Sequence, residues 1–109
     1  MGYFAEDDKP VYLYKIDKNN ELECRKGHFM SYIGCFRDDD ETKKYNHYTC
    51  ADEEGAVYGA SVWFYEPNER KAATILSMHY EREIEKLQSR IDGLIDKLEA
   101  LDSILQEEN

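Results

Sequence analysis

The residues with the most obvious chemical potential are three cysteines and two histidines in the first half of the sequence. Their side chains could ligate a metal ion or form a nucleophile–base pair. However, no C-x-x-C pair is present, and structural zinc sites usually draw their ligands from such closely spaced pairs. No nucleophile signature surrounds the cysteines, and their odd number argues against a disulfide framework. We therefore expect no enzymatic activity, no catalytic residue, no metal and no cofactor from this set, which comprises Cys24, His28, Cys35, His47 and Cys50.

Acidic residues gather in two runs, 38–41 and 52–54. Such runs are usually solvated loops, and they lack the apolar surroundings that raise the pKa of a catalytic carboxyl group. The first run also lacks the alternation of a calcium-binding loop. The chain has 24 acidic and 14 basic residues and a net charge of −10, so neither direct nucleic-acid binding nor a membrane-surface role is expected. An acidic chain is better suited to contact a basic protein.

Aromatic residues are the second unusual feature: nine Tyr, four Phe and one Trp, nearly all before residue 66. Residues 1–66 cannot bury all of them, and exposed Tyr and Trp side chains are typical of binding surfaces. A packed aromatic core with Tyr hydroxyls at its rim remains the alternative, and exposed Tyr rings could also stack on a nucleotide. The acidic and aromatic residues that we predict to contact a partner are Asp38, Asp39, Asp40, Glu41, Tyr45, Tyr48, Asp52, Glu53, Glu54, Tyr58 and Trp63.

The elements that position these residues are short strands. Segments rich in β-branched and aromatic residues alternate with Gly, Asn, Asp or charged stretches, the pattern of consecutive antiparallel strands. Asn and Asp at 17–20 predict a hairpin over residues 11–25. Gly27 is expected to break the strand pattern, and Gly34 to mark a bulge or a close approach of two backbones. The predicted strands are residues 11–16, 21–25, 28–36, 45–51 and 56–65.

The faces of the predicted sheet follow from the alternation of side chains along a strand. Tyr12 and Tyr14 are expected on one face, and Val11 and Leu13 on the other. The charged stretch 37–44 is predicted to be a loop too polar to bury. Residues 1–66 are therefore expected to form a small antiparallel β meander or an SH3-like barrel.

The spacing of the apolar residues along the sequence changes at Pro67, from that of strands to that of a helix. Proline is favoured in the first helical turn, and Glu69 would complement the positive end of a helix. No proline follows, so a helix is predicted from about Asn68 to Glu107, with Gly93 at an exposed position. The expected fold class is α+β, with a β domain at 1–66 and a long helix at 67–109. The first apolar residues of the helix are expected to cover one face of the sheet: Ala72, Ile75, Leu76 and Tyr80.

The strongest pattern in the sequence lies further along this helix. Seven apolar residues follow one another at alternating steps of three and four, the a/d rhythm of a coiled coil. Because a 3.5-residue repeat faces a partner only when two helices supercoil, we predict self-association from about 84 to 105. Ile at a with Leu at d favours a parallel dimer, whereas Ile95 and Ile104 widen the stripe and leave an antiparallel pair or a four-helix arrangement open. The a positions are Ile84, Ile91, Leu98 and Leu105, and the d positions are Leu87, Leu94 and Leu101.

Residues 57–84, VYGASVWFYEPNERKAATILSMHYEREI, resemble the end of small uncharacterised phage proteins of low-GC Gram-positive hosts. In those proteins a V-W-F strand runs into a helix that begins with an acidic turn and an Ala-x-x-Ile-Leu step. Here the strand is Val62-Trp63-Phe64, the acid is Glu69, and the step is Ala72 with Ile75-Leu76. The resemblance covers about a quarter of the chain, implies an early or accessory phage gene product and transfers no site residue.

The expected function is that of a non-enzymatic, oligomeric interaction protein. It would bind a basic, nucleic-acid-handling protein by charge mimicry, as a phage counter-defence inhibitor does. The alternative is an oligomeric binder, or sponge, of a nucleotide-type small ligand, with its pocket at a subunit interface. The N-terminal MGYFAEDDKP has no basic start and no apolar run, and no segment approaches the roughly 18 apolar residues of a membrane span. We therefore expect a cytoplasmic location, the host cytoplasm if the protein is phage-encoded.

Overall fold

The computed structural model describes residues 9–30, 35–40, 42, 47–51 and 53–107. The chain divides into two compact units, residues 1–79 and residues 80–109, so that the last element contributes to both. Each unit is described by itself. Within the described residues the elements in chain order are β1 (Pro10–Ile16), β2 (Leu22–Met30), β3 (Cys35–Asp38), β4 (His47–Thr49), β5 (Ser61–Phe64) and α1 (Glu69–Glu107).

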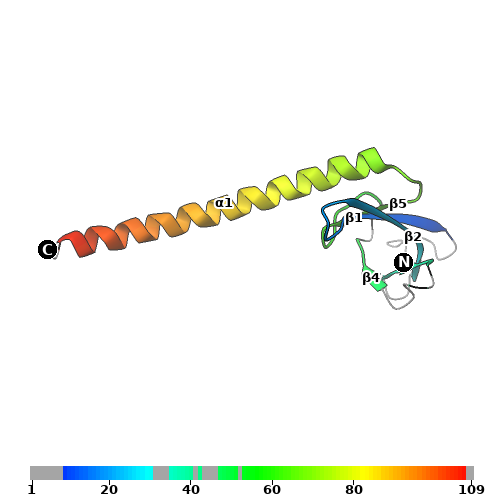
Figure 1. The fold of residues 1–109 in the computed structure, drawn as a ribbon, viewed down its shortest axis with the longest axis horizontal. Coiled ribbons are helices and arrows are strands. Elements are labelled where there is room, and N and C mark those ends of the chain that lie inside the picture. The colour runs from blue at the N-terminus through cyan, green and yellow to red at the C-terminus, as the bar shows by residue number, and fades with distance from the viewer. Residues whose placement is uncertain (1–8, 31–34, 41, 43–46, 52, 108–109) are drawn as a thin grey trace. The chain divides into compact units, whose positions relative to one another are not determined.

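The strands form one antiparallel sheet in the order β4-β3-β2-β1-β5 (Figure 1). From β1 to β4 each strand pairs with the next, which is the meander that the turn pattern predicts. The last strand, β5, returns to the free edge of β1, where Leu13 lies opposite Trp63. With the long helix that follows, this confirms the predicted α+β fold class.

The predicted hairpin over residues 11–25 is confirmed. β1 and β2 pair from Pro10 opposite His28 to Ile16 opposite Leu22. In the turn, the Asp17 carboxylate accepts hydrogen bonds from the backbone N–H groups of Asn19 and Glu21, at 2.8 and 3.0 Å. Asn20 adopts the left-handed conformation with φ of 64°, which Asn tolerates better than most residues.

Two expectations about the middle strands are wrong. Gly27 does not break the strand but lies inside β2, opposite Asp38 of β3. A Cβ atom there would lie 2.5 Å from Cζ of Phe36 and would also clash with the carbonyl oxygen of Arg37. The bulge or close backbone approach predicted at Gly34 lies outside the described residues. The predicted strand 28–36 is instead the end of β2 and the beginning of β3.

Both faces of the sheet bury side chains, in the alternation that the sequence predicts. One cluster contains Val11 and Leu13 of β1, and the ring of Trp63 packs edge-on against Phe29 with centroids 5.0 Å apart. The opposite face carries Tyr14, with Tyr12 partly buried beside it. The full membership of the first cluster is Val11, Leu13, Phe29, Phe36, Cys50 and Trp63; that of the second is Tyr14, Val62, Phe64, Ala72 and Leu76.

The beginning of α1 covers the second face, as expected. Ala72 and Leu76 are buried there and Ile75 is partly buried. Asn68 caps the helix, because its side-chain oxygen accepts the backbone N–H of Lys71 at 3.1 Å. Tyr80 does not join this cluster: it is 39 % exposed and belongs to the second unit.

Candidate functional site

The second unit presents the most unusual surface of the chain. Its helix exposes a row of large apolar side chains, which we call the seam: Ile84, Leu87, Ile91, Leu94, Leu98, Leu101 and Leu105. These side chains are between 54 and 62 % exposed. Single exposed apolar residues are common on proteins, whereas a continuous row of them is typical of interaction surfaces.

The geometry of the helix explains why these residues lie in one row. Successive a and d residues are separated by 3.5 residues on average, whereas a straight α-helix has 3.6 residues per turn, so the row drifts by about 20° per heptad. A straight neighbour would lose contact with it after a few turns. A helix with the same repeat keeps contact by supercoiling, and a second copy of this chain has that repeat by definition.

The positions that flank the seam carry both charges and apolar side chains. At the e and g positions, Ile95 is 45 % and Ile104 54 % exposed, which widens the apolar row. The g positions also include Arg90 and Lys97, and Asp102 occupies an e position. These are the side chains that would lie beside a partner helix, so their charges bear on its orientation.

The predicted partner-binding surface of the first unit is only partly available. Asp38 is 5 % exposed, and its carboxylate accepts a hydrogen bond from Nε of Arg25 at 2.6 Å and one from the backbone N–H of Asp40 at 2.9 Å. The bond to Asp38 raises the pKa of the Arg25 guanidinium. Asp38 is therefore a structural ion-pair partner inside the sheet and not a surface contact, and the expectation that residues 37–44 are too polar to bury is wrong at this position.

The next two acids are exposed but also have neighbours of their own. A carboxylate oxygen of Asp39 lies 2.8 Å from Nδ1 of His28. Asp40 accepts a hydrogen bond from the hydroxyl of Thr42 at 2.7 Å, and its carboxylate lies 3.5 Å from Nη2 of Arg25. Part of the negative field expected from this run is thus balanced within the unit.

The predicted aromatic contact residues also include both buried and exposed side chains. Trp63 is 2 % exposed, and its indole N–H donates to the backbone oxygen of Ala51 at 2.8 Å. It is a core residue, so its assignment to the partner surface is wrong. Tyr58 is 52 % exposed and remains a candidate contact.

The rest of the predicted surface is less completely described. Glu53 is exposed, and the exposed Glu54 carboxylate accepts the backbone N–H of Tyr65 at 2.9 Å. Tyr48 lies in β4, and only its backbone is described. Glu41, Tyr45 and Asp52 lie outside the described residues.

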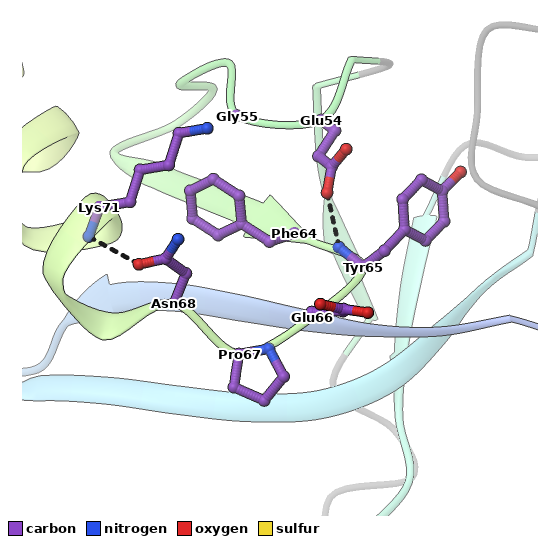
Figure 2. A pocket seen from close by; sticks show the side chains of 8 residues that line it. All are labelled: Glu54, Gly55, Phe64, Tyr65, Glu66, Pro67, Asn68 and Lys71. Atoms are coloured by element: carbon purple, nitrogen blue, oxygen red, sulfur yellow. Dashed lines mark hydrogen bonds between the residues drawn. The ribbon is translucent and has the colours of Figure 1, made fainter.

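A pocket that the sequence analysis missed lies where β5 leads into α1. It has a volume of about 370 Å³ and is open to solvent. Figure 2 shows the side chains that line it. The Lys71 ammonium lies 5.6 Å from the centroid of the Phe64 ring. The pocket contains two carboxylates and one ammonium group, so its charge does not suit an anionic ligand. Its lining residues are Glu54, Gly55, Phe64, Tyr65, Glu66, Pro67, Asn68 and Lys71.

The pocket depends on backbone geometry rather than on a side-chain pattern. Gly55 donates its backbone N–H to the carbonyl oxygen of Trp63 at 2.9 Å, which holds the preceding turn against the end of β5. Gly55 itself adopts a φ of 82°. The only sequence signal was the pair of breakers Gly55 and Pro67 on either side of the last strand, and this pair does not specify a cavity.

The candidate metal ligands are not brought together where the structure can be assessed. In the described part of the chain, no three His, Cys, Asp or Glu side chains are placed to share a metal ion. Cys50 is buried, Cys35 is half-buried and Cys24 is exposed. Nor does any helix in that part have the length and apolar character needed to cross a membrane.

Comparisons with protein-family models, with curated proteins and with solved structures found no match to this chain.

Proposed function

We propose that this protein is a non-enzymatic interaction protein that self-associates through residues 84–105 of α1 and presents its sheet unit to a protein partner. The observation that carries the proposal is the seam, whose seven side chains are 54–62 % exposed and follow one heptad register. The proposal accounts for a row of apolar residues that would otherwise face water along the helix.

The energetics support self-association. Complete burial of a Leu or Ile side chain stabilises by about 1.5–3 kcal/mol, so covering one that is half exposed gains about 1 kcal/mol. The seam has seven such side chains in each copy, and a pair of copies covers both sets at once. The sum exceeds the lower estimates of the cost of association, which is about 4–15 kcal/mol.

The partner that we propose for the sheet unit is a basic protein. The support is the net charge of −10, together with the exposed carboxylates of Asp39, Asp40, Glu53 and Glu54. The specific form of the proposal is inhibition of a nucleic-acid-handling protein by charge mimicry, in line with the resemblance to phage accessory proteins. Asp38 adds no exposed charge to this surface, because its carboxylate is paired with Arg25 inside the sheet.

The location that we propose is the cytoplasm. The support is the odd number of cysteines, three, which argues against the disulfide framework of a small secreted protein.

The alternative, a nucleotide-type ligand bound in a pocket at a subunit interface, gains no support from the pocket beside Phe64. The pocket beside Phe64 offers one ammonium group, from Lys71, against the carboxylates of Glu54 and Glu66. A phosphate-bearing ligand would meet net repulsion there.

The test uses the full chain and two matched double variants. Leu94→Glu with Leu98→Glu places two charges in the seam, whereas Ser89→Glu with Ser103→Glu adds the same charge at f positions on the opposite side of the helix. We expect size-exclusion chromatography with light scattering to give an oligomer for the parent and for the Ser variant, and a monomer for the Leu variant. Equal masses for the two variants would contradict the proposal.

A further inference from the structure

We infer that the second copy lies parallel and in register along the seam, so that both sheet units of a dimer are joined to the same end of the paired helices. The inference rests on the proposed self-association and names the orientation of the partner at that site. The charges beside the seam support this orientation, because the apolar residues alone permit both.

The apolar residues of the seam fit an antiparallel partner almost as well as a parallel one. If the two helices ran in opposite directions around a centre between Asp92 and Gly93, every a residue would face a d residue. Ile84 would then face Leu101, and Ile91 would face Leu94. In a parallel pair, a faces a and d faces d, and Ile at a with Leu at d is the combination that favours two parallel strands. Leu at the later a positions weakens this preference, so the orientation depends on the charges beside the seam.

The parallel arrangement places compatible side chains beside the seam. In it, each g residue faces the e residue five positions later on the second copy. Lys97 then faces Asp102 of the second copy, an attractive pair that the two-fold symmetry repeats. Arg90 faces Ile95 of the second copy, where the methylene stem of the arginine can cover the exposed isoleucine while its guanidinium reaches water. Glu83 faces the neutral Gln88, so these three g–e contacts include no like-charge pair.

The antiparallel arrangement instead places like charges opposite each other beside the seam. There, g residues face g residues and e residues face e residues. In the alignment that covers the whole seam, Arg90 faces Lys97 of the second copy, and Glu81 faces Asp102. Symmetry repeats both contacts, which gives four like-charge contacts and removes the attraction between Lys97 and Asp102. Each such contact changes the association constant by about twofold, so together they are large enough to select the orientation.

The parallel orientation has a consequence for binding. The sheet unit precedes residue 80 in the chain, so in each copy it is joined to the N-terminal end of the seam. Helices packed in a coiled coil are about 8–10 Å apart, so two parallel seams bring the two points of attachment close together. The dimer would then be bivalent, with both sheet units able to reach one target, and this raises the apparent affinity without any new contact.

The test is a charge reversal at Lys97 in the full chain. Lys97 has no charged residue three or four positions away in its own helix, so Lys97→Glu acts through the partner. In a parallel dimer, Lys97→Glu replaces two attractions to Asp102 by two repulsions and should weaken association about tenfold. In an antiparallel dimer it replaces two repulsions from Arg90 by two attractions and should tighten association. Sedimentation equilibrium measures the constant.

The matched control is Lys86→Glu, which makes the same charge change at a c position. It exchanges the exposed ion pair between Lys86 and Glu83, whose atoms are 3.6 Å apart, for pairs with Arg82 and Arg90, each four residues away on the same helix. Each contact of this kind contributes little. Weaker association for Lys97→Glu than for Lys86→Glu supports the parallel orientation. Equal or tighter association overturns it but leaves self-association intact, whereas a parent chain that is monomeric removes both proposals.

A mixing experiment provides an independent readout. The second variant is Asp102→Lys, which repels itself in a parallel dimer but attracts Lys97→Glu at both g–e contacts. Native mass spectrometry of an equimolar mixture should show more heterodimer than the statistical half. A statistical mixture would overturn the parallel orientation, because the antiparallel contacts give the heterodimer no such advantage.

Discussion

The backbone N–H of Asn68 donates a hydrogen bond to the hydroxyl oxygen of Tyr14 at 3.0 Å. Tyr14 lies on β1 and Asn68 caps α1, so this bond joins two elements that are 54 residues apart in sequence. It satisfies one of the backbone donors that every helix leaves without an intrahelical partner at its N-terminus. The start of α1 is therefore held on the sheet by a polar contact as well as by Ala72 and Leu76.

Removing that hydroxyl should destabilise the first unit. Tyr14→Phe keeps the ring, which packs edge-on against Phe64 with centroids 6.1 Å apart, but leaves the Asn68 N–H without its acceptor. We expect the free energy of unfolding to fall by about 1 kcal/mol. Urea unfolding followed by the fluorescence of buried Trp63 measures this change. Tyr58→Phe at an exposed position is the control, and an equal loss in both variants would contradict the assignment.

Replacing Gly27 and replacing Gly93 by alanine should have opposite effects on stability. Gly27→Ala should destabilise the sheet by more than about 2 kcal/mol, because its Cβ would clash with Phe36 and the backbone of Arg37. At Gly93 an added Cβ meets nothing within 4 Å, so Gly93→Ala should stabilise the helix by about 0.5–1 kcal/mol. Thermal unfolding followed by circular dichroism at one protein concentration checks both. A lower melting temperature for Gly93→Ala would show that the glycine has a packing role.

The ion pair between Arg25 and Asp38 should contribute more to stability than the exposed ion pair between Arg25 and Asp40. Asp38→Asn leaves the partly buried guanidinium without its carboxylate, and we expect a loss of about 2 kcal/mol in the free energy of unfolding. Asp40→Asn weakens a longer contact of 3.5 Å at an exposed carboxylate and should cost less than about 0.5 kcal/mol. Urea titrations of both variants give the comparison. Similar losses would mean that burial does not distinguish the two carboxylates.

Cys50 should make the protein sensitive to alkali. Burial raises the pKa of its thiol from 9.0 to about 12, because the thiolate is disfavoured in the core. The unfolded chain loses this proton first as the pH rises, so stability is complete below about pH 9 and falls between pH 9 and 12. The slope from this group is about 1 kcal/mol per pH unit. Burial is also the largest of the causes that raise the pKa of Tyr14, and the hydrogen bond of Tyr14 with Cys24 is the next. The folded protein therefore loses further stability above pH 10.

The measurement that isolates the Cys50 contribution is urea unfolding of Cys50→Ala between pH 8 and 11. The variant should be less stable at pH 8, where the thiol packs in the core, but should lose stability more slowly as the pH rises. An unchanged slope would mean that Cys50 does not titrate within this range.

The parts of the fold that could be predicted from sequence are those in which one period extends over many residues. The helix was expected from Asn68 to Glu107 and runs from Glu69 to Glu107. Its bounds were predictable because the apolar residues repeat at helical spacing without interruption and a proline precedes the first turn. The two faces of β1 were also predicted correctly, since alternation along a strand fixes them once the strand exists.

The predictions that were wrong concern residues whose role depends on a contact with another strand or turn. Asp38 stands in a run of acids and looked solvated, but Arg25 lies beside it because β2 and β3 pair. Trp63 looked like a binding anchor, whereas Ala51 supplies an acceptor for its indole N–H inside the core. Gly27 looked like a break in a strand and is instead required by the ring of Phe36. These contacts join residues on different strands or turns, so no local pattern predicts them.

The central claim is that a second copy of the chain covers the seam, and sedimentation equilibrium of the unmodified protein tests it most directly. The account predicts a mass of at least two chains of 12.9 kDa that falls towards one chain on dilution. A mass of 12.9 kDa that persists as the protein concentration is raised would contradict the account.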